Sequence, residues 1–408
     1  MKILNFGSCN IDYVYTLEHI VRVGETLSSH TLKTFPGGKG LNQSIAIARA
    51  GAVVYHAGCV GEDGQMLTDL LTASGVNTSY LSTAASKNGH AIIQVSATGD
   101  NSIFIYPGSN GMVTKELIDT VLADFNAGDI LLLQNEISNV PYLIKEAHRK
   151  QMQIIFNPSP FQNELLELDL NMLSYMILNE VEAKELSGCE QPEEALAFFK
   201  KRYPDLKIIL TLGEEGAIYA DQQQTVRQSA FQIKVVDSTA AGDTFTGYFV
   251  AGISCSMKIK EALRLASAAA AITVSKNGAA PSIPLKNEVL TALKTLKPRD
   301  TESKDAQLLK EATAFMQKQI RDVTLSALAA HLKYSPVYAG TLVKRLTGKT
   351  FSAYLQEIRC QAAAHLLLTS DLSVKEIIQA VGYENESFFR KIFKEKYGLN
   401  PLQYRKER

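Results

Sequence analysis

A string of small and acidic residues near position 240 has the composition of a site for phosphoryl transfer. Residues 237–247 read D-S-T-A-A-G-D-T-F-T-G and lead into a helical pattern. Small residues before a helix leave backbone N–H groups free to hold an anion. Asp243 stands at the start of that helix, where its carboxylate can take a proton from an attacking hydroxyl group. A single acidic residue there is more often a structural cap, so the prediction rests on the whole string.

A second glycine-rich string, G-G-K-G-L-N at residues 37–42, precedes an alanine-rich helical stretch. Glycine lets the backbone approach a ligand closely, and the amide of Asn42 can bond to sugar hydroxyl groups. A tight turn into a helix explains this string equally well. A third string, residues 211–216, follows an apolar run and is weak evidence by itself. The sequence contains neither a Walker A motif nor the signature set of protein kinases, which argues against those two classes.

The composition is that of a globular protein with more than one domain. The chain has 408 residues, of which 46% are hydrophobic and 21% charged, and this length exceeds what one core usually supports. No apolar run is long enough to cross a membrane, and the N-terminus becomes polar too early for a signal peptide. The five cysteines are scattered and form no C-x-x-C pair. We therefore expect a cytoplasmic protein in a reducing compartment.

The net charge of zero conceals an uneven distribution. Residues 301–408 contain 17 Lys and Arg against 11 Asp and Glu, whereas residues 1–300 contain 25 against 31. A basic C-terminal region on an acidic body indicates an anionic partner such as nucleic acid, although a solvated helix face would carry the same excess.

The first 300 residues alternate short apolar runs with helical patterns such as residues 193–202. Four runs are continuously apolar, as in buried strands of a mainly parallel sheet: 130–133, 154–156, 175–178 and 208–210. Repeated βα units predict a doubly wound α/β sheet with helices on both faces. Residues 12–35 and 90–106 instead have alternating strand patterns, with a hairpin turn at 97–101. They predict a small separate β-layer, a candidate lid.

A polar stretch at residues 297–305 is the predicted linker, and helical periodicity continues from there to the end. The pattern is two helix-turn-helix units with a connecting helix between them, at 323–332, 337–346, 351–368, 373–381 and 386–397. Ser335 and Ser373 are the expected N-caps. One such pattern is weak evidence, because any short helical hairpin imitates it, but two in tandem with matched glycine stops are much stronger.

In the order and spacing of these strings, residues 1–296 resemble the ribokinase-like (PfkB) carbohydrate kinases. The resemblance implies their fold, with Asp243 as the catalytic base. It implies sugar contacts at Asn10, Asp12, Gly38, Lys39, Asn42 and Glu136. It implies nucleotide contacts at Asn179, Thr211, Gly213, Gly216, Ala241, Gly242 and Ser267. Ser267 departs from the family, which often has a larger polar residue near the adenine.

The same resemblance implies two metal ions. Glu182, in the N-x-x-E element at residues 179–182, is implicated in handling magnesium and phosphate. Potassium is implied beside the anion hole that residues 241 and 242 help to form, at Asp237, Thr239, Thr273, Lys276, Gly278 and Ser282. The resemblance implies that Thr273, Lys276 and Gly278 use their backbone carbonyls. Carbonyl and carboxylate oxygens suit a hard cation. Within the family, residues 24–26 and 278–284 make the resemblance to ribokinase the strongest.

Residues 306–408 resemble the DNA-binding domain of AraC/XylS-type regulators, most sharply at 382–394 and 398–405. In that family the second helix of each unit lies in a major groove. This implies DNA contacts at Val337, Thr341, Glu386, Ser387, Arg390, Lys391 and Lys394. The first unit offers few bidentate hydrogen bonds, so base readout is expected mainly from the second. The helical spacing of Phe389, Ile392 and Phe393 places them in the core.

These inferences predict a pentose kinase domain (1–296) that uses ATP, a linker (297–305) and a DNA-binding domain (306–408) that regulates transcription. Ribose is the favoured sugar, giving ribose 5-phosphate, with deoxyribose or another pentose as alternatives. A homodimer paired through the lid segments is also expected. Two other hypotheses are a sugar-sensing regulator with a catalytically silent kinase fold and a kinase whose tail only mediates assembly. A retained base at Asp243 argues against the first, and the basic tandem repeat argues against the second.

Overall fold

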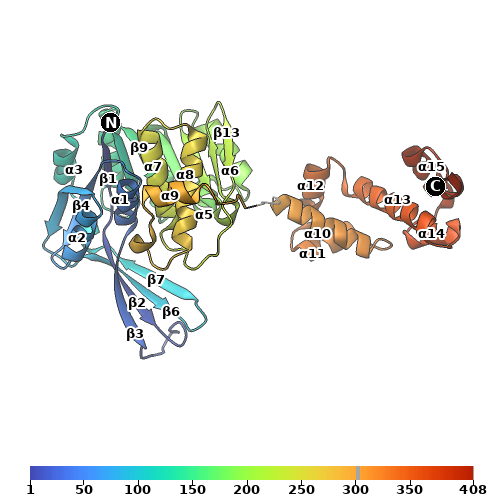
Figure 1. The fold of residues 1–408 in the computed structure, drawn as a ribbon, viewed down its shortest axis with the longest axis horizontal. Helices are drawn as coiled ribbons and strands as arrows, with labels where there is room; N and C mark the ends of the chain where they lie inside the picture. The colour runs from blue at the N-terminus through green and yellow to red at the C-terminus, as the bar shows by residue number, and fades with distance from the viewer. Residues whose placement is uncertain (300–303, 408) are drawn as a thin grey trace. The chain divides into compact units, whose positions relative to one another are not determined.

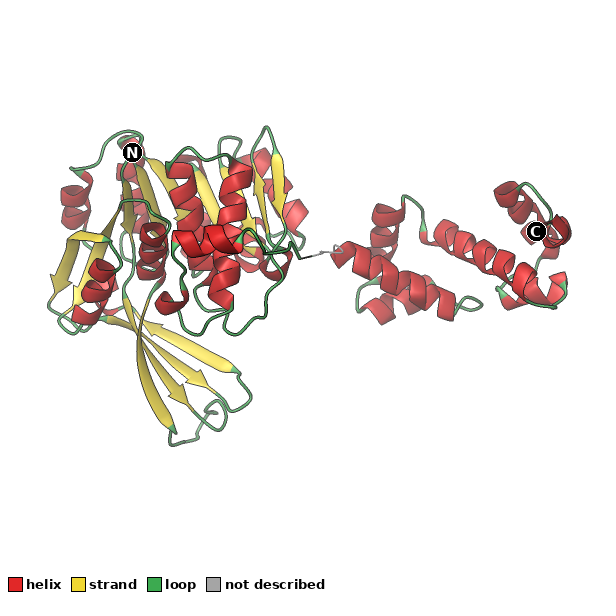
Figure 2. Cartoon of the chain, in the orientation of Figure 1, coloured by secondary structure: helices red, strands yellow, loops and turns green. Residues whose placement is uncertain are grey.

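The computed structural model describes residues 1–299 and 304–407 and divides into two compact units, residues 1–299 and 300–408 (Figure 1). The predicted linker at 297–305 lies partly outside the described residues, because 300–303 are among those not described. The first unit is α/β and the second is all helical (Figure 2). No helix in the described part of the chain is long and apolar enough to cross a membrane.

A nine-stranded sheet forms the centre of the first unit, in the order β13-β12-β11-β10-β9-β8-β1-β4-β5. The pairs from β5 to β11 are parallel, and β12 and β13 add an antiparallel edge. The strands are β1 Ile3–Phe6, β4 Val54–Gly61, β5 Asn77–Ala84, β8 Ile130–Gln134, β9 Gln153–Asn157, β10 Tyr175–Asn179, β11 Lys207–Thr211, β12 Ala217–Ala220 and β13 Thr225–Gln228. All four predicted apolar runs are strands of this sheet.

Helices cover both faces of the sheet, as predicted. Successive strand residues point to opposite faces: on β8, Ile130 and Leu132 join one core cluster, whereas Leu131 and Leu133 join the other. The first face is covered by α1 Lys39–Arg49, α2 Gln65–Ala73, α7 Ala241–Ser254, α8 Ile259–Val274 and α9 Lys286–Ala292. The second is covered by α3 Lys115–Leu122, α4 Val140–Arg149, α5 Glu180–Ser187 and α6 Pro192–Arg202.

The predicted lid is a four-stranded sheet, in the order β3-β2-β6-β7, that extends away from the main sheet (Figure 1). Its strands are β2 Asn10–Thr16, β3 Thr31–Gly37, β6 Gly89–Val95 and β7 Asn101–Tyr106. The hairpin turn lies between β6 and β7, as expected. Residues 17–30, which the sequence placed in a strand pattern, form the long connection between β2 and β3 instead.

The second unit contains the two helix-turn-helix pairs. Its helices are α10 Lys304–Lys318, α11 Leu325–Leu332, α12 Pro336–Thr347, α13 Phe351–Thr369, α14 Val374–Ala380, α15 Glu386–Tyr397 and α16 Pro401–Glu407. Ser335 and Ser373 are N-caps, accepting hydrogen bonds from the N–H groups of Tyr338 and Glu376. The helix predicted from 323 starts at Leu325, because the side chain of Thr324 caps it.

Each helix-turn-helix pair has its own small core. The first cluster gathers residues of α10, α11, α12 and α13, and the second gathers residues of α13, α14, α15 and α16. Phe389, Ile392 and Phe393 are buried in the second cluster, as their spacing predicted. α13 therefore contributes one stretch of side chains to each core.

Candidate active site

Polar side chains gather where the parallel strands end. Ser8 lies just after β1, Glu136 just after β8, and Asn157, Asn179 and Thr211 are the last residues of β9, β10 and β11. In an open α/β sheet this edge is the usual place for a ligand, because the connections diverge there.

Asp243 lies in the first turn of α7 and is held by two amides from the first turns of α1. Asn42 Nδ2 donates to Asp243 Oδ2 at 3.0 Å, and Gln43 Nε2 donates to Oδ1 at 3.0 Å. The two helices can approach this closely because Gly247 has no side chain: a Cβ there would lie 2.4 Å from Ala46 Cβ. The carboxylate is only half-buried, so it remains accessible from the adjoining cleft.

A further carboxylate, that of Glu136, and the side chain of Lys39 lie near this position. Glu136 Oε2 accepts hydrogen bonds from the Ser8 hydroxyl and, at 3.2 Å, from the backbone N–H of Lys39. Burial raises the pKa of Glu136, although Lys39 opposes this shift. Burial also disfavours the charged form of Lys39, but the carboxylates of Asp243 and Glu136 outweigh it and raise the lysine pKa. The lysine therefore keeps its charge in this site.

The end of the site beside the lid is lined by groups suited to hydroxyl donors. Burial, with Glu136 and Asp243 nearby, raises the pKa of Asp12 to about 7. Asn42 Oδ1 is buried and has no hydrogen-bond partner among the described residues, so a donor from a ligand would satisfy it. Asn10 is buried, and its Oδ1 accepts a hydrogen bond from Asn110 at 2.7 Å. Gly38 precedes α1 with φ 96°, a conformation that disfavours other residues.

The start of α7 forms a second part of the site. Ala240 precedes the helix with φ 59°, and no side chain caps the helix there. The Ala241 N–H donates to the Ser238 carbonyl at 3.3 Å, and the N–H groups of the next two residues are available to an anion. Asn179 caps α5 in a reciprocal arrangement with Glu182, each accepting a backbone N–H of the other. These residues line one cleft with Asp243: Lys39, Asn179, Glu182, Ala240, Ala241 and Gly242. A cleft with a lysine and a helix N-terminus suits phosphate groups.

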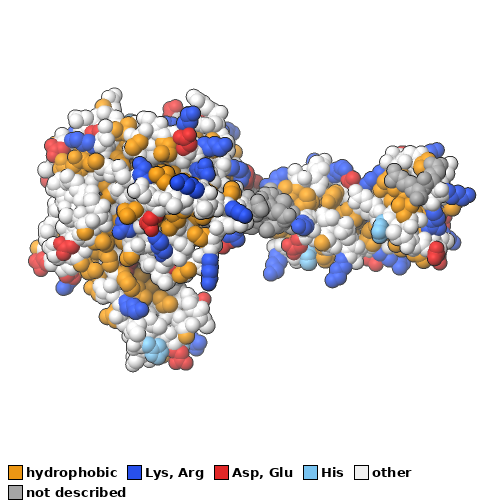
Figure 3. Space-filling model, in the orientation of Figure 1, with side chains coloured by type: hydrophobic (Ala, Val, Ile, Leu, Met, Phe, Trp, Pro, Cys, Tyr) orange, Lys and Arg blue, Asp and Glu red, His pale blue; other side chains and the backbone are white. Residues whose placement is uncertain are grey.

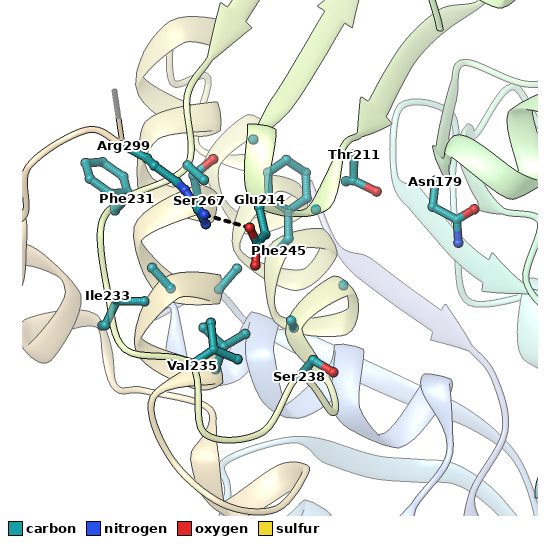
Figure 4. Close-up of a pocket in the computed structure, with 18 residues that line it drawn as sticks. Asn179, Thr211, Glu214, Phe231, Ile233, Val235, Ser238, Phe245, Ser267 and Arg299 are labelled. Atoms are coloured by element: carbon teal, nitrogen blue, oxygen red, sulfur yellow. Dashed lines mark ion pairs between the residues drawn. The ribbon is translucent and has the colours of Figure 1, made fainter. Parts of the chain in front are cut away.

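An apolar pocket adjoins this cleft (Figure 4). It shares Asn179, Thr211, Ser238, Ala241 and Gly242 with the cleft, so the two are continuous. Its remaining lining includes Gly213, Glu214, Gly216, Phe231, Ile233, Val235, Phe245, Ser267 and Arg299. The Ser267 hydroxyl is buried without a hydrogen-bond partner in the described structure. The pocket suits a flat, largely apolar group with a few polar atoms, such as a nucleobase.

Three of the residues predicted to hold potassium are joined by hydrogen bonds, because Asp237 contacts both Thr239 and Gly278. Asp237 Oδ1 accepts hydrogen bonds from the backbone N–H and hydroxyl of Thr239, and Oδ2 accepts from the N–H of Gly278 at 2.9 Å. Burial opposes ionisation of Asp237, but these hydrogen bonds lower its pKa. The side chains of Thr273, Lys276 and Ser282 bond elsewhere, to Thr244, Glu288 and the Ala279 carbonyl. From those positions the backbone oxygens, together with the lone pairs of the Thr273 and Ser282 hydroxyls, would be available to a cation.

Sequence reasoning missed three residues of the site. Gln43 holds Asp243, Ser8 holds Glu136, and Asn110 holds Asn10. Gln43 stands next to Asn42 in the glycine-rich string, so its position was a signal that could have been used. Asn110 comes from the short 3₁₀ helix Gly108–Met112, and no motif marks it.

The predicted DNA contacts lie on two helices of the second unit, over which Lys and Arg side chains are spread (Figure 3). On α12, Val337 is 81% exposed and Thr341 bonds back to its carbonyl at 3.0 Å. On α15, Ser387, Lys391 and Lys394 are exposed. Glu386 and Arg390 lie one turn apart and form an ion pair at 3.7 Å.

One exposed side chain on α15 was not predicted. Phe388 is 51% exposed between Ser387 and Phe389. The adjacent Phe389 is fully buried, so the aromatic pair in the sequence divides between the core and the surface. An exposed aromatic ring on this helix suits contact with a thymine methyl group.

Comparison with known proteins finds matches to both parts of the chain. The family model for pfkB family carbohydrate kinases matches residues 1–286, and a helix-turn-helix domain model matches residues 328–407. Ribokinase from Bacillus subtilis is 35% identical over 287 residues, 69% of this chain and 96% of its own length. Ribokinase from Haemophilus influenzae is 33% identical over 297 residues, 70% of this chain and 96% of its own length.

Solved structures give the same result. The structure of ribokinase from Arabidopsis thaliana, complexed with ribose and ATP, matches with a TM-score of 0.64 and 31% identity, covering 72% of this chain and 98% of that one. The match lies in the α/β part, and the AraC-type helix-turn-helix domain follows it in the same chain. The chain therefore belongs to the pfkB family of carbohydrate kinases, as a ribokinase-like kinase fused to an AraC-type DNA-binding domain.

Proposed function

We propose that the first unit transfers the γ-phosphoryl group of ATP to a pentose, ribose being the favoured sugar and ribose 5-phosphate the product. The observation that carries the proposal is the position of Asp243. Two amides hold its carboxylate between the hydroxyl-binding end, at Asp12 and Asn42, and the uncapped start of α7. A base at that junction lies beside the attacking hydroxyl group of the sugar and beside the phosphate that the hydroxyl attacks.

In this proposal each group has one task. Asp12, Asn42 and Glu136 orient the sugar, and Asp243 accepts the proton of the attacking hydroxyl. The N–H groups at the start of α7 and the ammonium of Lys39 stabilise the charge that develops on the transferred group. The base of the nucleotide occupies the pocket around Phe231, Phe245 and Ser267.

Two metal ions complete the proposed site. Magnesium would arrive with ATP and neutralise phosphate charge, and Glu182, which lines the phosphate end, would hold it. Potassium would lie beside the start of α7, held by Asp237 and by backbone carbonyls near residues 273–282. An ionised, hydrogen-bonded Asp237 among backbone oxygens is a donor set for a hard cation.

A transfer assay separates this function from the sensor hypothesis. The full chain is mixed with ATP, Mg²⁺, K⁺ and either ribose or deoxyribose, and release of ADP and of the sugar phosphate is followed. Rapid formation of ribose 5-phosphate supports the kinase. Binding of sugar and nucleotide without turnover would instead identify a catalytically silent sensor. Turnover of deoxyribose but not of ribose would show that deoxyribose is the substrate of the kinase.

We further propose that the second unit binds double-stranded DNA and regulates transcription. Support comes from the excess of basic residues beyond position 300 and from the exposed Lys391 and Lys394 on α15. Each phosphate neutralised by Lys or Arg contributes about −0.9 to the slope of log K against log salt. Steep salt dependence is therefore expected in a gel-shift titration of the full chain, and no DNA binding at low salt would reject the proposal.

A homodimer is proposed through the lid. β7 is an edge strand, and four consecutive residues on it are exposed and apolar or aromatic: Ile103, Phe104, Ile105 and Tyr106, at 47–55%. An open apolar edge is a template for pairing with another chain. A dimer would also present two DNA-binding domains to an operator. Sedimentation of the full chain as a monomer at micromolar concentration would contradict this proposal.

A further inference from the structure

The segment at the end of the first unit, Lys297–Arg299, is paired with the wall of the apolar pocket. Gln232 N–H donates to the Lys297 carbonyl at 3.0 Å, and Arg299 N–H donates to the Ala230 carbonyl at 2.7 Å. Phe231 and Pro298 form the antiparallel bridge between these two bonds. Ala230 and Phe231 line the pocket, so this segment, which we call the exit segment, forms the second layer of the pocket wall.

The Arg299 side chain enters the pocket itself (Figure 4). Its Nη2 lies 2.6 Å from Oε2 of Glu214, which comes from the short 3₁₀ helix Gly213–Glu215 on another side of the pocket. The two side chains are 43% and 70% exposed, and an exposed ion pair adds little to folding stability. The ion pair instead matters for the chemistry of the pocket, because it brings a guanidinium and a carboxylate into a lining that is otherwise mostly apolar.

This arrangement matches the chemistry of an adenine ring. Adenine offers an acceptor at N7 beside a donor at N6, and Arg299 and Glu214 offer a donor beside an acceptor. A planar guanidinium also stacks on an aromatic face. Ser267, which lines the same pocket, has a buried hydroxyl without a partner in the described residues, which a ring nitrogen would satisfy. These are separate observations that point to the same ligand class, an adenine nucleotide.

We propose that Arg299 contacts the base of the bound nucleotide, and that nucleotide binding and docking of the exit segment stabilise each other. The inference rests on the proposed kinase function, because it needs a nucleotide in this pocket. If the nucleotide binds more tightly when Arg299 is in place, then by linkage the bound nucleotide holds the exit segment more firmly. The exit segment is the last described part of the first unit, so occupancy of the kinase site sets how firmly the C-terminal end of this unit is held.

The test compares the full wild-type chain with R299A, using ADP as the probe in calorimetry. We expect R299A to bind ADP about 2- to 5-fold more weakly, the range of one cation–π contact at an exposed site, with an unchanged KM for ribose. R299K, which keeps the charge but loses the planar face, should also bind ADP more weakly than wild type. The matched control is R227A: Arg227 forms an exposed ion pair with Glu193 on the same unit but lines neither part of the site, so its ADP affinity should not change.

Amide hydrogen exchange provides a second readout. ADP should slow exchange in peptides covering residues 230–232 and 297–299 of the wild type and R227A, and slow it less in R299A. Equal ADP affinity of R299A and wild type, or exchange at these peptides that does not respond to ADP, would overturn the inference while leaving the kinase proposal intact. If the wild type bound no ADP at all, the proposed kinase function would fail first, so the two failures are distinguishable.

Discussion

Asn42 and Asp243 are 201 positions apart in the chain, yet the Asn42 amide donates to the Asp243 carboxylate at 3.0 Å. This bond joins the first turns of α1 and α7, the two helices that lead out of the glycine-rich string and the D-S-T-A-A-G-D string. The Asn42 oxygen, on the same side chain, has no partner in the described residues. One amide can thus position the base and receive a sugar hydroxyl at the same time.

Replacing Asp243 by Asn should abolish phosphoryl transfer and leave ribose binding largely intact. The substitution removes the proton acceptor, while the backbone N–H groups of α7 and the sugar contacts stay, and losing a general base typically costs about 100- to 10,000-fold in rate. ADP release gives kcat, and calorimetry gives ribose affinity. D205N, at an exposed position before β11, serves as the control and should keep wild-type turnover. Near-normal turnover of D243N would reject Asp243 as the base.

Potassium should raise kinase activity well above the activity in sodium or lithium. The expected reason is that K⁺, held by Asp237 and backbone carbonyls, fixes the loop that leads into α7 and adds positive charge near the transferred phosphate. The measurement is kcat in chloride salts of the three cations at equal ionic strength. D237N should lose most of the potassium effect, since it removes the charged ligand. Equal rates in all three salts would mean that no selective site exists.

Replacing Asp12 by Asn should stabilise the ligand-free protein more at pH 8 than at pH 5. Burial raises the pKa of Asp12 in the folded state from 3.8 to about 7, so the folded state holds a proton that the unfolded state has released. Stability from this group is therefore lost as the pH rises from about 4 to 7, by at most about 4 kcal/mol. Thermal unfolding of D12N and wild type at several pH values tests this. A difference in Tm between D12N and wild type that is independent of pH would contradict the raised pKa.

The second recognition helix should determine DNA sequence preference more than the first. Arg390 and Lys391 on α15 offer donors to base edges, whereas Val337 and Thr341 on α12 offer mainly methyl groups. A selection from random duplexes compares the double variant R390A/K391A with V337A/T341A. The α15 variant should relax the preferred sequence at more positions, at about 1–3 kcal/mol for each lost bidentate contact. Greater loss of specificity in the α12 variant would reverse this assignment.

The sequence by itself determined most of the elements, because their signals are local, although residues 17–30 form a connection where a strand pattern was expected. A run such as 130–133 is apolar at every position, which suits a short strand buried on both faces of a sheet. Ser335 and Ser373 marked helix starts because a side-chain oxygen satisfies an N–H three residues later. The glycine-rich and D-S-T-A-A-G-D strings likewise identified Asn42 and Asp243 as members of one family pattern.

Only the tertiary structure decided which side chains meet. Gln43 bonds to Asp243 across 200 positions, and Asn110 bonds to Asn10 across 100. These partners are chosen by strand order and helix packing, which no short pattern records. The clearest case is Arg299. It lies in a polar, charged stretch whose composition predicts a linker. In the structure, Lys297–Arg299 pairs with residues 230–232, and the Arg299 side chain lines the apolar pocket beside Glu214. Periodicity describes how a segment folds, whereas a binding site depends on segments that the sheet brings together.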